Sequence, residues 1–138
     1  MTSRLTEINI DCADPARLAD FWCAALGYVV LDATDGLVEI GPPGRVDAEL
    51  LEAVRRGPLA PSLFFAQVPE GKTVKNRLHL DVSPIDGTQA DEVARLEALG
   101  ARPADVGQGD VSWVVMADPE GNEFCVLRSL APGEFALA

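Results

Sequence analysis

The chain has 138 residues, of which 48% are hydrophobic, a size and composition that suit one domain with one packed core. Its formal net charge of -11 argues against a nucleic-acid partner and against acidic membrane surfaces, because both attract basic proteins. No apolar run is long enough to cross a bilayer and the chain starts without a secretion signal, so we expect a cytoplasmic protein.

The first half of the chain predicts a helix between strands. Polar and apolar side chains alternate up to Cys12, as on a half-buried strand. Asp14 is a good N-cap, Pro15 suits the first helical position, and Gly27 is expected to end the helix. Residues 42–61 are rich in proline and helical only between about residues 46 and 56, which predicts an insertion or flap. The strands are expected at 4–12, 28–31, 37–40 and 62–68.

The second half repeats this order. The sequence Ala25-Leu26-Gly27, at the end of the first predicted helix, returns as Ala98-Leu99-Gly100. Glu7 then corresponds to His79, and Asp14 to Asp86. A helix is expected from about residue 88 to 99, with strands at 77–82, 101–106, 111–117 and 122–129.

Two such units predict an α+β fold in which two βαβββ modules form a curved mixed sheet around a cavity. We therefore expect a single domain over residues 1–138, with module one at about 1–70 and module two at about 76–130. Equivalent strands of the two modules would face the shared cavity, so their polar residues are candidates for a site. The short strands also leave sheet edges to cover, which favours a homodimer.

Polar side chains on half-buried strands usually form the solvent face of a sheet, and that is the simplest interpretation of any one of them. If the two sheets face each other, however, Glu7, Asn9, Gln67, Asp81 and Glu123 would converge with His79. His79 is the only histidine. One imidazole together with nearby carboxylates is enough to bind a divalent ion such as Mn, Ni, Mg or Fe. A hydrogen-bonded histidine in a cavity fits the same pattern.

Aromatic and sulfur-containing side chains add to the expected pocket. Phe65 and Trp113 are candidates for contact with a small-molecule ligand. Cys125 lies in the last predicted strand, and we expect it to be a buried, inert thiol. Three cysteines without a CxxC pair predict reduced thiols.

Three motifs together resemble the vicinal oxygen chelate superfamily, in its glyoxalase-like/bleomycin resistance protein/dioxygenase branch. These are "DCADPARLADFWCAALGY" after the first strand, "NRLHLDV" at the start of the second module and "DPEGNEFCVL" at the last hairpin. The resemblance covers nearly the whole chain. It implies two βαβββ modules, a small-molecule ligand and a homodimer. The superfamily includes isomerases, lyases, dioxygenases and metal-free drug-binding proteins, so the resemblance leaves the activity open.

Metal-dependent members of that superfamily draw one ligand from each of four strands. Carried over by position, these fall on Glu7, on Phe65 or Gln67, on His79, and on Cys125 or Glu123. The resemblance thus implies His79, Glu7 and Glu123 as metal ligands, with Glu7 or Glu123 as the catalytic base. His79 is the one position that matches the family directly.

Two functions remain open on the sequence. In the first, a divalent ion held by His79, Glu7 and Glu123 binds an oxygen-bearing substrate, and lyase, isomerase or dioxygenase chemistry follows. In the second, the protein carries no metal and sequesters a small molecule, with Phe65 and Trp113 as contacts. We expect little bound metal, because the ligand set departs from the family pattern.

Overall fold

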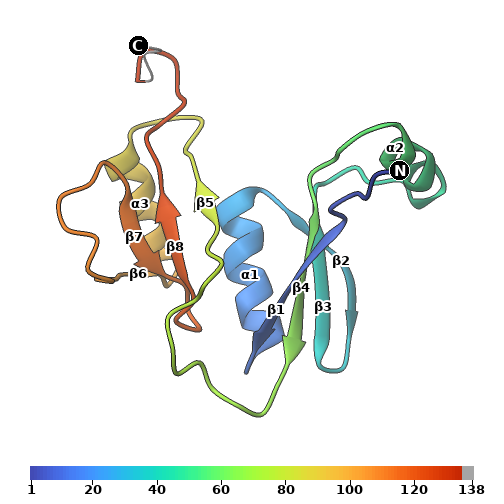
Figure 1. The fold of residues 1–138 in the computed structure, drawn as a ribbon, viewed down its shortest axis with the longest axis horizontal. Helices are drawn as coiled ribbons and strands as arrows, with labels where there is room; N and C mark the ends of the chain where they lie inside the picture. Colours follow the sequence, from blue (N-terminus) through green and yellow to red (C-terminus); the bar gives the residue numbers. More distant parts are fainter. Residues whose placement is uncertain (135–138) are drawn as a thin grey trace. The chain divides into compact units, whose positions relative to one another are not determined.

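Each half of the chain folds as a four-stranded mixed sheet with a helix packed on it, as Figure 1 shows. The structure is a computed structural model and describes residues 1–134. The chain divides into two units, the first comprising Met1–Gly71 and the second starting at Lys72.

In the first unit, the outer strand β1 (Glu7–Cys12) runs parallel to β4 (Ser62–Gln67). The sheet continues through antiparallel neighbours in the order β1-β4-β3-β2. The remaining elements are α1 (Pro15–Leu26), β2 (Val29–Thr34), β3 (Leu37–Gly41) and α2 (Asp47–Arg56).

The second unit repeats this topology with shorter strands. Its sheet has the order β5-β8-β7-β6, and β5 is again parallel to its neighbour β8. The elements are β5 (Asp81–Val82), α3 (Gln89–Ala98), β6 (Arg102–Pro103), β7 (Val114–Ala117) and β8 (Glu123–Val126). The predicted α+β fold of two modules with the same order of strands is confirmed.

The core of the first unit lies between α1 and one face of its sheet. The helix begins as predicted: the Asp14 side chain accepts a hydrogen bond of 3.1 Å from the backbone nitrogen of Arg17, and Pro15 follows. It ends at Gly27, whose φ of +69° is a left-handed conformation that favours glycine. The buried side chains that meet in this core are Leu18, Phe21 and Trp22 of the helix and Val38, Ile40, Leu63 and Phe65 of the sheet.

Helix α3 packs on the second sheet and begins where the sequence predicts, next to residue 88. Its N-cap is Thr88, whose side chain accepts from the backbone of Asp91 while the Asp91 carboxylate accepts from the backbone of Thr88. Asp86, the sequence counterpart of Asp14, therefore lies outside the helix. Leu96 is the buried residue of this helix.

The strands of the second unit are shorter than their alternating patterns predicted. The ladder of β5 starts only at Asp81, and Leu78 is 92% exposed. The alternation from residue 77 does not give a long strand: only Asp81 and Val82 pair with β8, at Cys125 and Val126, and residues 77–80 lie outside the strand. The predicted strand at 101–106 shrinks in the same way to Arg102–Pro103, where a proline cannot donate to the ladder.

Within residues 1–134, none of the helices is long and apolar enough to cross a bilayer. The cytoplasmic location and the homodimer stay predictions.

Candidate functional site

The second unit contains a pocket of about 330 Å³ on one face of its sheet. Its walls combine apolar side chains with a few groups that can bind a metal or donate hydrogen bonds. The residues that line it are Lys75, His79, Asp81, Val106, Gln108, Trp113, Val115, Glu123, Cys125 and Leu127. His79, Asp81, Trp113 and Glu123, which the sequence placed in one site, all border this pocket.

Three potential metal ligands lie together on the pocket wall. His79 Nδ1 is 3.3 Å from Asp81 Oδ1 and 4.0 Å from Cys125 Sγ. One ligand atom of each residue lies within 4.8 Å of the others. The sheet explains this grouping, because His79 and Asp81 are two positions apart and Asp81 is the register partner of Cys125 across β5 and β8.

The sulfur of this group sits in a shielded position. Cys125 is only 6% exposed. Burial raises the pKa of its thiol, and the neighbouring Asp81 carboxylate raises this pKa further through its charge and a hydrogen bond. The thiol is therefore protonated at neutral pH, and an ion binding here would have to displace that proton.

Glu123 is held in place by the segment that precedes β5. Its carboxylate receives a hydrogen bond of 2.9 Å from Lys72 Nζ and one of 3.0 Å from the backbone nitrogen of Asn76. The side chains of Glu123 and Lys72 are 15% and 21% exposed. Burial alone would raise the pKa of Glu123, but these hydrogen bonds and the Lys72 charge outweigh it and lower the pKa to about 2. Such a carboxylate is a weak general base at neutral pH.

The other predicted site residues belong to the first unit. Glu7 borders a separate cavity of about 490 Å³ beneath α2, and Asn9 is exposed further along β1. Gln67 lies beside the start of α1, where its amide donates to the Ala13 carbonyl at 3.2 Å. That Glu7, Asn9 and Gln67 share one cavity with His79 stays a prediction.

The placement of Phe65 in a pocket is wrong. Phe65 is 0% exposed and pairs with Ile10 and Val38, so it faces the core against α1. Its neighbour Phe64 is half-buried and pairs with Asn9 and Glu39 on the opposite face. The error arises because adjacent residues of a strand point to opposite faces of the sheet. Since Phe64 and Phe65 are both phenylalanine, the sequence does not indicate which of them faces the core.

Asp81 was expected beside His79 but not as a metal ligand, and the resemblance left the ligand from the last strand open between Glu123 and Cys125. The expected inertness of Cys125 rests on the lack of an activating neighbour along the chain. The signal that identifies it is the register of β5 against β8, which joins residues far apart in the chain. Within the described residues, the three-ligand group contains Asp81 and Cys125 in place of Glu7 and Glu123.

Comparison with known proteins places this architecture in a family. The family model for the glyoxalase-like domain matches residues 7–127. A search of curated proteins found no match.

Solved structures share the fold at low sequence identity. A glyoxalase/bleomycin resistance protein/dioxygenase family enzyme from Burkholderia phytofirmans is 16% identical, with a TM-score of 0.62 over 93% of this chain and 99% of that one. The fosfomycin resistance protein FosX from Mesorhizobium loti is 12% identical, with a TM-score of 0.63 over 92% of each chain. A FosX mutant from Listeria monocytogenes, also 12% identical, has a TM-score of 0.62 over 94% of this chain and 92% of that one.

The family match spans most of the chain and both units. The strand order within each unit agrees with it, as do the motifs at the first helix, at the start of the second unit and at the last hairpin. This chain therefore belongs to the glyoxalase-like domain family of the vicinal oxygen chelate superfamily.

Proposed function

We propose that this protein is a metal-dependent enzyme that acts on a small oxygen-bearing molecule, with His79, Asp81 and Cys125 as the protein ligands of a divalent ion. The observation that carries the proposal is the grouping of these three ligand atoms within 4.8 Å on the wall of a pocket. This grouping, which differs from the ligand set of the sequence analysis, is why we propose a bound ion where the sequence alone led us to expect little metal. Three protein ligands leave coordination positions for substrate oxygens, as in catalytic metal sites generally.

The three donors fit a borderline divalent ion better than a hard one. Imidazole and thiolate suit Zn, Ni and Fe(II), whereas Mg and Mn prefer oxygen ligands. Of the ions expected from the sequence, Ni and Fe are therefore favoured over Mn and Mg. A bound ion would polarise a substrate oxygen, which supports lyase or isomerase chemistry. Dioxygenase chemistry would need Fe(II) in particular.

The remaining pocket residues hold the substrate and shield it. Trp113, Val106 and Leu127 form apolar walls that exclude water from the bound molecule. Lys75 borders the same pocket and supplies a positive charge for an anionic group. Glu123 acts as an anchor for the 72–76 segment, which carries Lys75, and the pKa of about 2 makes it an unsuitable base.

A structural neighbour supports metal chemistry on this fold. The FosX mutant from Listeria monocytogenes was solved in complex with Mn(II) and a dihydroxypropylphosphonic acid. At 12% identity the comparison concerns the fold, and the ligands proposed for this chain rest on its own residues.

The second candidate is a metal-free protein that sequesters a small molecule in the same pocket. It is favoured by the contact between His79 and Asp81, because a carboxylate can satisfy the imidazole without an ion. The half-exposed Trp113 ring would then provide the main contact.

Elemental analysis separates the two candidates. Protein dialysed against excess Ni, Fe(II) or Zn and then against buffer is expected to keep about one ion per chain, and His79→Ala and Cys125→Ala are expected to lose it. Cys23→Ala, which removes a thiol from α1 in the first unit, is the matched control and should keep the ion.

Each other outcome has a definite meaning. A wild-type protein that keeps no ion refutes the metal-dependent enzyme and leaves the binding protein. If Glu123→Gln loses the ion while Cys125→Ala keeps it, the sequence-based ligand set of His79, Glu7 and Glu123 is supported instead.

A further inference from the structure

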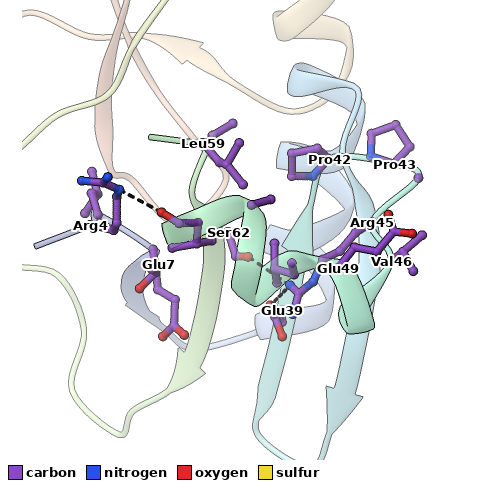
Figure 2. Close-up of a pocket in the computed structure, with 17 residues that line it drawn as sticks. Arg4, Glu7, Glu39, Pro42, Pro43, Arg45, Val46, Glu49, Leu59 and Ser62 are labelled. Atoms are coloured by element: carbon purple, nitrogen blue, oxygen red, sulfur yellow. Dashed lines mark hydrogen bonds and ion pairs between the residues drawn. The ribbon is translucent and has the colours of Figure 1, made fainter. Parts of the chain in front are cut away.

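The first unit contains a cavity of about 490 Å³ that the proposed metal site does not use. Figure 2 shows it between α2, the segment after β3 and the first residues of β1. Its volume is in the range of small-molecule binding sites. Most of its wall is apolar, with side chains from Leu5, Pro42, Pro43, Val46, Leu50 and Leu59.

Helix α2 turns its apolar face toward this cavity. Val46, just before the helix, and Leu50, Ala53 and Val54 within it recur every three or four residues and line the cavity. A stripe of this kind normally packs in a core, yet none of residues 47–56 is buried. The helix thus has an apolar face but little protein to pack against it, and a ligand in the cavity would fill that role.

The positive charges at the cavity are already engaged. Arg45 forms ion pairs of 2.6 Å with Glu39 and 2.8 Å with Asp47. Arg4 donates from Nε to the Val54 carbonyl at 2.9 Å, at the carboxyl end of α2. An anionic ligand would have to break the two ion pairs of Arg45, and Arg4 is held at the end of α2 by the carbonyls of Val54 and Arg55.

The negative charge of Glu7 is not engaged in this way. Among residues 1–134, no ion pair or hydrogen bond to the Glu7 side chain is present. Glu7 starts β1 and pairs in register with the buried Ser62, so its backbone is fixed at the cavity wall. Its exposed carboxylate has no partner to give up among the described residues, so a ligand cation could pair with it beside apolar walls.

We propose that the cavity beneath α2 binds a small molecule with an apolar body and a cationic head group, the head group pairing with Glu7. The apolar body packs against Leu50, Ala53 and Val54. The inference goes beyond the proposed metal-dependent activity, because every residue in it belongs to the first unit and none is among the proposed ligands His79, Asp81 and Cys125. It gives Glu7 a role other than the metal ligand that the resemblance implied.

The test uses three probes with one apolar body and different head groups: 4-phenylbutylamine, 4-phenylbutanol and 4-phenylbutyrate. Each is titrated into isotope-labelled protein while backbone amide resonances are followed. We expect saturable shifts at residues 4–7 and 46–60, with the amine bound about 10-fold more tightly than the alcohol, as for a charge-assisted hydrogen bond. The butyrate should bind most weakly of the three.

Variants separate the head-group contact from the apolar contact. Glu7→Gln should reduce affinity for the amine about 10-fold, to that of the alcohol, without changing the alcohol itself. Glu52→Gln is the matched control, because Glu52 lies on α2 but outside the cavity and pairs with Arg56. Ala53→Phe, which fills the cavity, should weaken the amine and the alcohol alike.

The proposal is overturned if the butyrate binds as tightly as the amine, or if Glu7→Gln leaves the amine unaffected while its amide spectrum shows a folded protein. Shifts confined to residues 75–127 would place the probe in the pocket of the second unit and also refute it. The proposal is also refuted if no probe saturates the protein up to about 10 mM, a concentration above the millimolar dissociation constants of weak specific ligands.

Discussion

The ion pair between Glu123 and Lys72 should make a measurable and pH-dependent contribution to stability. The pKa of Glu123 falls from an ordinary 4.5 to about 2 in the folded protein. At about 1.4 kcal/mol per pKa unit, this shift corresponds to an upper limit of about 3.4 kcal/mol. Because both side chains keep some contact with water, which screens their attraction, we expect Glu123→Gln to lose about 2 kcal/mol at pH 7.

The sign of the pH dependence follows from the lowered pKa. The carboxylate stabilises the fold fully above pH 4.5, its ordinary pKa, and this contribution is lost as the pH falls toward 2. The difference in free energy of unfolding between wild type and Glu123→Gln should therefore shrink to less than half of its neutral value at about pH 3.

Urea unfolding at several pH values measures this difference directly. Glu97→Gln, on the exposed side of α3, is the control and should change stability by no more than about 0.5 kcal/mol at any pH. A Glu123→Gln effect that is equal at pH 7 and pH 3, or smaller than that of the control, would show that Lys72 and the Asn76 backbone do not stabilise the carboxylate.

Three further outcomes test the core, a helix cap and the metal site. Phe65→Ala should destabilise the protein by about 3–5 kcal/mol in urea unfolding, and Phe64→Ala by clearly less, since only Phe65 is fully buried; equal losses would contradict the assignment of faces. Thr88→Ala, which removes the cap of α3, should lose about 1 kcal/mol, and an unchanged unfolding midpoint would count against the cap. Metal affinity should rise with pH because the pKa of the Cys125 thiol is raised and the thiol must lose its proton. Calorimetry in buffers of different ionisation heat measures that proton release, and its persistence in Cys125→Ala would assign the proton to another group.

The helices were predictable because their signals are local. Asp14, Pro15 and Gly27 lie within or next to α1 and mark its ends without reference to the rest of the chain. The same holds for α2, which was expected near residues 46–56 and spans Asp47–Arg56. It also holds for α3, which was expected at about residues 88–99 and spans Gln89–Ala98, with Thr88 and Asp91 forming the capping box at its start.

The strands and the site depended on pairing, which the sequence does not specify. The alternation from residue 77 was correct as a pattern, but only Asp81 and Val82 find a partner in β8. Phe65 and Phe64 are chemically the same, and the register with β1 decides which of them enters the core. His79 and Asp81 could be found together because they are two positions apart, whereas Cys125 joins them only through the parallel ladder.

The parallel pairing also constrains the order in which each unit can form. In both units the first strand pairs with the last, so β1 has no neighbour until β4 has been synthesised, and β5 none until β8 has emerged. The intervening helix and hairpin consist of contacts between nearby residues, whereas these pairs close long loops and raise the contact order of the unit. The segment that carries His79 and Asp81 is therefore expected to be joined to Cys125 late in folding, after α3 and the antiparallel strands are in place.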